Sequence, residues 1–180
     1  MGSNLLLRKP VKADIERMFV LLENSLGSFL EVNKSSPKNL QLIIEKDSVR
    51  SYLNADIYLC LIAEINSEIV GWMAGSSQDD ILLEHGCSPG EFYIEEIVVD
   101  HRHRSKGIGT TLLGGIPEEH LTALVVDTLQ INKNAIAFYE KRGFAKVSGL
   151  PEGFNMSWIR MAKPTGLRCN RRGSQQDAKG

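Results

Sequence analysis

A short glycine-containing turn between a strand and a helix most constrains the fold of this chain. The turn is Arg104-Ser105-Lys106-Gly107-Ile108-Gly109; an apolar strand precedes it at residues 92–99, and an apolar helical stretch opens at 108–113. Such a turn presents free backbone N–H groups at the positive end of a helix dipole. This geometry binds phosphate through the main chain. We therefore predict an α/β domain with a phosphate-bearing ligand at residues 104–109.

Two common phosphate-binding sequences do not match this turn well. The P-loop string G-x-x-x-x-G-K-[ST] is absent. The dinucleotide fingerprint G-x-G-x-x-G has Leu112 in place of its third glycine, although Asp127 follows near the place of the ribose-binding acid. A dinucleotide site and a plain tight turn with two solvated charges therefore stay open as alternatives.

Two motifs in the same order resemble the GNAT N-acetyltransferase superfamily. The strand Glu95-Glu96-Ile97-Val98-Val99-Asp100 followed by Arg104-x-x-Gly107-x-Gly109 is similar to the family's strand and [RQ]-x-x-G-x-[GA] turn. The later string Asn132-x-x-Ala135-x-x-Phe138-Tyr139-Glu140-Lys141-x-Gly143-Phe144 is similar to N-x-x-A-x-x-[LF]-Y-x-x-x-G-F. The resemblance, nearest to the polyamine and small-amine branch, implies an acetyl-CoA-dependent N-acetyltransferase. It implies an α/β fold with a mixed, mostly antiparallel central sheet of six to seven strands, flanked by about four helices.

The resemblance also implies where acetyl-CoA binds. The backbone of the strand end would pair with the pantetheine arm and the acetyl carbonyl, and the N–H groups of the turn would hold the pyrophosphate. The Asn132 side chain would bond the pantetheine amides, and Lys141 would reach a CoA phosphate. The expected cofactor-binding residues are Ile97, Val98, Val99, Arg104, Ser105, Lys106, Gly107, Ile108, Gly109, Thr110, Asn132, Ala135, Phe138 and Lys141.

Acetyl transfer to an amine also needs a proton donor and a proton acceptor. Tyr139 is the expected general acid, because a phenol with a pKa of about 10 stays protonated at pH 7 and can protonate a thiolate. Glu95 and Glu96 are the candidate bases, and only one is expected to face the acceptor because successive strand side chains alternate. The polyamine branch carries an E-D pair here, so Glu95 ranks first as base and Glu96 as acceptor-binding. The alternative for Tyr139 is a core or partly buried structural tyrosine, and the alternative for either glutamate is a surface ion pair.

The charge pattern predicts a small cationic acceptor, similar to a polyamine or an aminoglycoside. Residues 51–101 contain no Lys or Arg, and a charge field of one sign concentrates an oppositely charged ligand. The acids of this stretch are Asp56, Glu64, Glu68, Asp79, Asp80, Glu84, Glu91, Glu95, Glu96 and Asp100. Three alternatives remain: solvated loop acids, a protein N-terminal or lysine acetyltransferase of the same fold, and a non-catalytic acyl-CoA-binding domain.

The composition is that of a soluble globular protein, with 42% apolar and 24% charged residues. No apolar run reaches the roughly 20 residues of a membrane span, and no secretory signal pattern is visible. Three widely spaced cysteines argue against a disulfide framework. We expect a cytoplasmic enzyme that needs no metal, binds neither nucleic acid nor membrane and, as is common in the family, forms a homodimer.

The chain is expected to form one domain, 1–163, followed by a basic tail, 164–180, predicted to be disordered because it is almost free of apolar residues. The helix predicted from residue 107 is expected to be short or broken near Gly115. The other helices are predicted at 11–24, from Ser36-Pro37 and at 135–142, and the strands at 5–8, 58–65, 68–75, 92–100, 121–129, 144–148 and 155–161.

Overall fold

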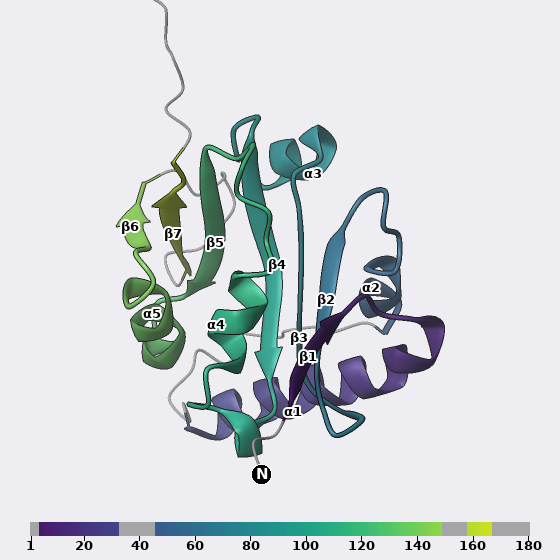
Figure 1. Cartoon of the computed structure of the whole chain (residues 1–180). Coiled ribbons are helices and arrows are strands. Elements are labelled where there is room, and N and C mark those ends of the chain that lie inside the picture. The colour runs from purple at the N-terminus through teal and green to yellow at the C-terminus, as the bar shows by residue number, and fades with distance from the viewer. Residues whose placement is uncertain (1–3, 33–45, 149–157, 167–180) are drawn as a thin grey trace, which may run out of the picture.

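The computed structural model describes residues 4–32, 46–148 and 158–166, with a seven-stranded sheet at its centre (Figure 1). The strand order is β1-β2-β3-β4-β5-β7-β6, and every neighbouring pair is antiparallel except β4 and β5. The predicted α/β class and mostly antiparallel sheet are thus confirmed. The strands are β1 Leu5–Arg8, β2 Leu59–Ile65, β3 Glu68–Ser76, β4 Glu91–Val99, β5 Ala123–Leu129, β6 Ala145–Val147 and β7 Trp158–Pro164.

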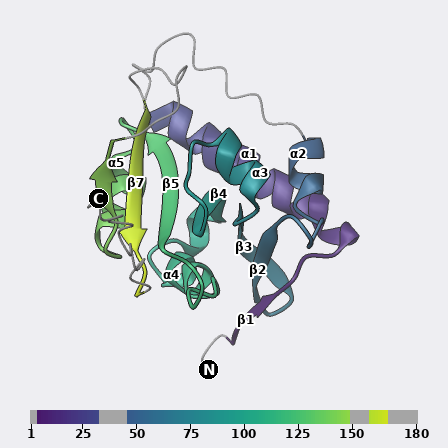
Figure 2. The ribbon, with the colours of Figure 1, turned by 90° about the horizontal axis from the view of Figure 1, so that it is seen from above.

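Helices cover both faces of the sheet (Figure 2). The view from above shows α1, α2 and α3 on one side and α4 on the other. The described helices number five rather than about four, because a helix forms in the polar connection before β4. They are α1 Ile15–Val32, α2 Lys46–Ser51, α3 Asp79–Glu84, α4 Ile108–Leu113 and α5 Lys133–Glu140, with 3-10 turns η1 Lys12–Asp14 and η2 His101–His103.

Each face of the sheet has its own apolar core. On the α1 side, the fully buried Trp72 packs with Met18 and Val98, and its indole N–H donates to the Met18 carbonyl at 3.0 Å. On the other side, Leu112 of α4 and Tyr139 of α5 join one buried cluster with residues of β3, β4 and β5. Helices and apolar side chains therefore cover both faces of the sheet. A site for a polar ligand is expected where the regular pairing of the strands is interrupted.

The helix boundaries differ from the predicted ones for identifiable reasons. Helix α1 continues through Gly27, beyond its predicted end at residue 24. Glycine in a helix costs only about 1 kcal/mol, and the burial of Leu21 and Leu22 contributes more than that. Helix α4 ends at Leu113, as predicted. A Cβ on Gly115 would lie 2.4 Å from Leu61. The helix predicted from Ser36 and the tail beyond residue 166 lie outside the described residues.

The irregularity lies in the middle of β4. Against β3, Ile94 pairs with Gly75 and Glu96 with Ala74, so Glu95 is the extra residue of a β-bulge. A Cβ on Gly75 would lie 2.4 Å from the Phe92 ring, so the strands can approach here only with glycine at that position. On its other edge β4 pairs with β5 only from Glu91 to Ile94. The two parallel strands separate immediately after that.

A buried ion pair fixes β5 to β7 beside this opening. Asp127 and Arg160 face each other across the two strands, and their side chains are 1% and 5% exposed. The guanidinium donates to both carboxylate oxygens, at 2.8 and 2.7 Å, and also to the carbonyls of His85 and Gly86. This use of Asp127 argues against the ribose-binding role of the dinucleotide alternative.

Arg160→Ala should lower the free energy of unfolding by about 3–5 kcal/mol, because it leaves the Asp127 carboxylate buried without its cation. Urea denaturation measures the change. Arg50→Ala removes an arginine from an exposed ion pair with Asp47 and should cost only about 0–1 kcal/mol. Equal effects of the two substitutions would contradict the role assigned to the buried pair.

Candidate functional site

A cavity of about 390 Å³ lies where β4 and β5 separate. Helices α1 and α2, with the residue that follows α2, supply a mainly apolar wall of Leu22, Leu26, Val49 and Tyr52. The rest of the described lining comes from two serines of α1 and α2, from the bulge of β4, from the ends of β5 and β7, and from α5 with its N-cap. These residues are Ser25, Ser48, Glu95, Glu96, Ile97, Val98, Val126, Asp127, Thr128, Leu129, Asn132, Ala135, Tyr139 and Trp158.

Glu95 and Glu96 of β4 both line this cavity, whereas regular alternation of strand side chains predicts that only one of them faces it. The physical reason is the bulge, because the extra residue interrupts the alternation of side chains. Glu96 pairs with Ala74, which packs on the α1 side of the sheet, as does Val98. The bulge brings Glu95 to the same side and separates it from Ile97 and Val99, which pack toward the opposite core.

The two candidate acid–base groups influence each other electrostatically. Burial, and then the charge of Glu95, raise the pKa of Glu96 to about 7. Burial, and then the charge of Glu96, raise the pKa of Tyr139, whose side chain is buried. A carboxyl group with a pKa near 7 and a phenol that keeps its proton form a complementary pair, an acceptor and a donor of protons at neutral pH.

The glycine-containing turn has the main-chain geometry of an anion site. Ser105 and Gly107 have φ values of 62° and 85°, in the left-handed region. Within the described part of the chain, no backbone N–H from Ser105 to Thr110 donates to a carbonyl. The turn is mostly exposed, and the Arg104 Nε donates to the Val99 carbonyl, which fixes the turn to the end of β4.

The two glycines of the turn differ in function. Gly107 has a left-handed conformation and open space around its Cα, which suits approach of a ligand. Gly109 is buried, and a Cβ there would lie 2.8 Å from the Phe138 ring. The absent side chain of Gly109 therefore allows α4 to pack against α5.

Helix α5 brings the second motif to the cavity. Asn132 is its N-cap, and the side-chain oxygen accepts from the Ala135 N–H at 3.2 Å, which leaves the amide N–H groups for a ligand. Asn132, Ala135 and Tyr139 line the cavity, whereas Phe138 and Lys141 are absent from its described lining. Phe138 packs on Gly109 instead, and Lys141 is exposed at the C-terminal end of the helix.

Arg142 is a further residue that the sequence analysis did not select. Its guanidinium stacks on the Phe138 ring at 3.7 Å and donates to the Thr110 hydroxyl. It thereby connects α5 to the first turn of α4 and adds a positive charge beside the glycine-containing turn. Its position four residues after Phe138 on a predicted helix was the available sequence signal.

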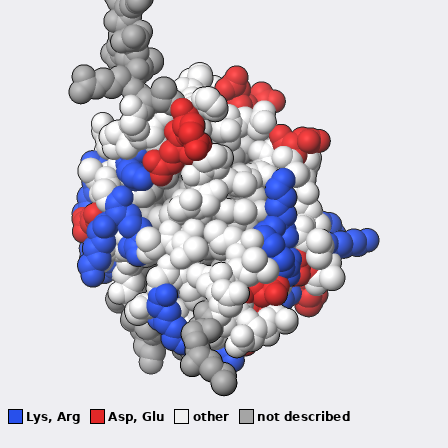
Figure 3. All heavy atoms as spheres, in the orientation of Figure 1, with Lys and Arg blue, Asp and Glu red and all other residues white. Residues whose placement is uncertain are grey.

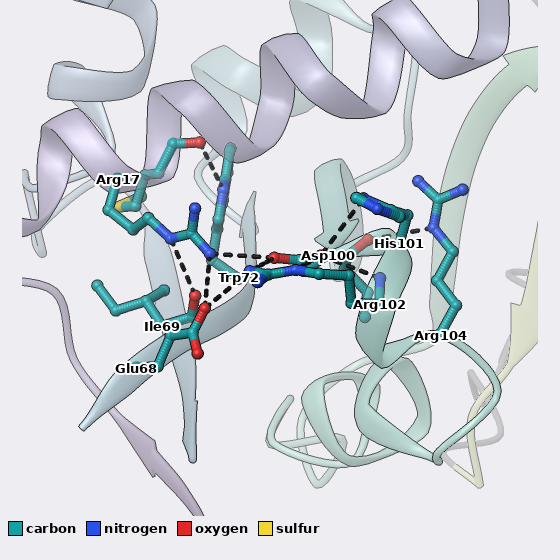
Figure 4. A network of polar contacts seen from close by, with 10 residues as sticks. Arg17, Glu68, Ile69, Trp72, Asp100, His101, Arg102 and Arg104 are labelled. Carbon is teal, nitrogen blue, oxygen red and sulfur yellow. Dashed lines mark hydrogen bonds and ion pairs between the residues drawn. The ribbon is translucent and has the colours of Figure 1, made fainter. Parts of the chain in front are cut away.

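A charged network joins the start of the turn to α1 (Figure 4). Arg17 of α1 donates to Asp100 and to the Ile69 carbonyl, and Arg102 of η2 donates to Asp100 and Glu68. Hydrogen bonds from Arg102, which has the larger effect, and from Arg17 hold the pKa of Asp100 well below its ordinary value. The network borders a small cavity of about 150 Å³ that also contacts Val99 and Arg104.

The acidic stretch of the sequence does not gather at the main cavity. Glu64 pairs with Arg8, while Glu68 and Asp100 are used in the network with Arg17 and Arg102. The acidic side chains in Figure 3 lie on separate parts of the surface, some beside basic ones. Of the ten acids, only Glu95 and Glu96 belong to the described lining of the cavity.

Two further properties of the described residues concern metals and membranes. No group of three or more His, Cys, Asp and Glu side chains is arranged to hold a metal ion in that part of the chain. None of the described helices combines the length and the apolar character that a membrane span requires.

Sequence comparison relates this site to proteins of known activity. The chain matches the Acetyltransferase (GNAT) family over residues 26–144. It is 30% identical to N-alpha-acetyltransferase 30 of Dictyostelium discoideum over 135 residues, which cover 68% of this chain and 70% of that protein. It is 40% identical to N-alpha-acetyltransferase 60 of Drosophila melanogaster over 113 residues, 51% of this chain but only 41% of that protein.

Solved structures share the fold at low sequence identity. The ribosomal-protein-S18-alanine N-acetyltransferase of Escherichia coli superposes with a TM-score of 0.65 at 15% identity, covering 93% of this chain and 98% of the other. Ard1 of Thermoplasma volcanium gives 0.66 at 20% identity, covering 89% and 97%. PaiA N-acetyltransferase of Thermoplasma acidophilum, solved in complex with coenzyme A, gives 0.62 at 15% identity, covering 90% and 99%.

Glu96→Gln should stabilise the protein in a pH-dependent way. Folding raises the pKa of this carboxyl from 4.5 to about 7, so the folded wild type binds more protons than the unfolded chain between these values. Its stability relative to the variant should therefore fall as pH rises through this window and then level off, by up to about 3 kcal/mol at about 1.4 kcal/mol per pKa unit. Urea denaturation over a pH series measures it.

Glu84→Gln, at an exposed carboxyl on α3, is the matched control for the loss of one charge. A constant difference between wild type and Glu96→Gln across the window would contradict the raised pKa of Glu96.

Proposed function

This chain belongs to the GNAT acetyltransferase family, and we propose that this acetyl-CoA-dependent N-acetyltransferase acts on the α-amino group of polypeptide N-termini. The observation that carries the proposal is the 30% identity to an N-alpha-acetyltransferase, which extends over 68% of this chain and 70% of that protein. The match to a second N-alpha-acetyltransferase supports it.

The cavity is consistent with such an acceptor. Glu95 and Glu96 suit the positive charge of an α-amino group, and the apolar wall of Leu22, Leu26 and Tyr52 suits the first side chain of a peptide. A small cationic amine is the second candidate, because two carboxylates in one cavity also suit a polyamine. The cavity has few further charges for the distant amines of a polyamine, since most of the acidic stretch lies elsewhere.

The described residues fit acetyl-CoA as the acyl donor. Among the described strands, none pairs with the β5-facing edge of β4 beyond Ile94, so the main-chain groups of Glu95 to Val98 on that edge are available to an extended amide-containing arm. The unpaired N–H groups of the turn at 105–110 suit a pyrophosphate, with Arg104 and Lys106 as nearby positive charges. The free amide N–H groups of Asn132 suit a carbonyl of the arm.

We assign the proton acceptor to Glu96 rather than to Glu95, which ranked first from the sequence. The Glu96 carboxyl, with a pKa of about 7, can take a proton from the ammonium form of the acceptor at neutral pH. Tyr139 lines the same cavity and keeps its proton because its pKa is raised. It can therefore protonate the departing thiolate. The cytoplasmic location and the homodimer expected from the sequence remain predictions.

Tyr139→Phe should lower kcat by about 10²–10⁴-fold, which is the usual contribution of a general acid to the rate. The affinity for acetyl-CoA should change little. Steady-state thiol release gives kcat, and calorimetry gives the affinity. Tyr58→Phe, at a tyrosine outside the described cavity lining, is the matched control and should retain wild-type kcat. Near wild-type kcat for Tyr139→Phe would show that another group protonates the thiolate.

The acceptor preference can be measured with peptides that differ only in their first residue. We expect a high kcat/KM for an apolar first residue such as Met, which suits the apolar wall, and a value more than about tenfold lower for Asp, because Glu95 and Glu96 repel a further carboxylate. High salt should narrow the difference. Spermidine and a peptide with a blocked N-terminus and an internal Lys complete the panel. A higher kcat/KM for spermidine would favour the second candidate, and acetylation of the internal Lys would favour a lysine acetyltransferase.

A further inference from the structure

His85, at the C-terminal end of α3, contacts Glu95, one of the two carboxylates that line the cavity. Its Nε2 atom is 3.3 Å from the Glu95 Oε1 atom, while the His85 side chain is 21% exposed and that of Glu95 is 18% exposed. His85 itself is not among the described residues that line the cavity. The pair therefore extends from the cavity wall toward solvent.

Buried groups hold the imidazole in this position. The ring stacks on Tyr93, with 3.9 Å between ring centroids and 17° between ring planes. The His85 carbonyl accepts from the Arg160 guanidinium at 2.6 Å, and Arg160 is fixed by Asp127. The Tyr93 hydroxyl donates to the same Asp127 carboxylate at 3.3 Å. A solvated surface histidine would not need such support from β4, β5 and β7.

The surroundings of the two carboxylates are asymmetric. Glu95 faces His85, and the other charged or titratable groups around that histidine are Tyr93, Arg160, Glu84 and Cys87. Glu96 interacts electrostatically with Glu95, Tyr139 and Tyr52. Phenols lie near both carboxylates, since Tyr52, Tyr58 and Tyr93 also interact electrostatically with Glu95. The asymmetry is the imidazole, which contacts Glu95.

We propose that His85 is a positioning residue that divides the roles of the two carboxylates: it holds Glu95 in a pair and leaves Glu96 to accept the amine proton. The inference rests on the proposed function only in placing an amine in this cavity. The acceptor ammonium gives one proton to the Glu96 carboxylate, and the free amine attacks the thioester carbonyl. Its nitrogen then loses a second proton, which replaces the proton that Tyr139 gives to the departing thiolate, while the proton on Glu96 passes to solvent. The C–N bond that forms replaces the C–S bond that breaks, and both side chains regain their starting protonation.

The test is the pH dependence of kcat/KM in wild type, His85→Ala and His85→Gln. In wild type the rate should rise with pH through the pKa of Glu96, about 7. Without a basic partner for Glu95, the two carboxylates compete for one proton, and the rise in His85→Ala should move to higher pH. Each unit of that shift lowers the rate below the transition about tenfold. His85→Gln keeps a hydrogen-bond donor but has no basic ring, so it should retain the wild-type KM and still show the shift. Added imidazole should partly restore His85→Ala.

His120→Gln, at an exposed histidine outside the cavity lining, is the matched control and should behave as wild type. A pH profile of His85→Ala that is superimposable on that of wild type would overturn the proposal. An equal loss at every pH, without rescue by imidazole, would overturn it too, since it indicates only a structural role. The comparison uses whichever amine the wild-type enzyme acetylates. If peptides are not substrates, the proposed acceptor fails while the role of His85 is still tested.

Discussion

The separation of β4 from β5 after Ile94 is the constraint on which the site depends. Inside a sheet, backbone N–H and C=O groups that lose their partner strand cost free energy unless water or a ligand replaces it. One edge of the central strand β4 is unpaired in this way. Its main-chain groups face a cavity whose other walls are helices on both faces of the sheet. An extended, amide-containing acyl donor is the kind of molecule that such an edge can pair with.

The bulge at Glu95 is the second consequence of the same interruption. A regular strand would send neighbouring side chains to opposite faces, whereas the bulge puts two carboxylates in one cavity. Two acids at one site cannot both be ionised without repulsion, which contributes to the raised pKa of Glu96. Gly75 makes the bulge possible from the opposite strand, because any side chain there would collide with Phe92. The backbone geometry thus sets the electrostatics of the site.

Arginines form ion pairs with the buried aspartates on either side of the cavity, Asp100 and Asp127. Arg17 and Arg102 bind Asp100 at the end of β4 and thereby connect α1 to the start of the glycine-containing turn. Arg160 binds Asp127 and also holds the main chain that carries His85. With these acids paired, the charge that an acceptor meets in the cavity comes mainly from Glu95 and Glu96. In the proposed function, two local carboxylates rather than a broad acidic surface would therefore recognise the acceptor.

The sequence alone determined the fold class, the strand–turn–helix order at Gly107, the short α4 and the motif that carries Tyr139, because these follow from local periodicity, turn chemistry and residue spacing. It did not determine which side of the sheet Glu95 faces, since a bulge depends on pairing with β3. It also did not show that the Phe138 ring leaves no room for a side chain at position 109, or that Arg142 hydrogen-bonds to Thr110. The acidic stretch was contiguous only along the chain. The tertiary structure divided it between arginine networks, exposed helix ends and one cavity, because ion pairs form between residues that folding brings together from distant segments.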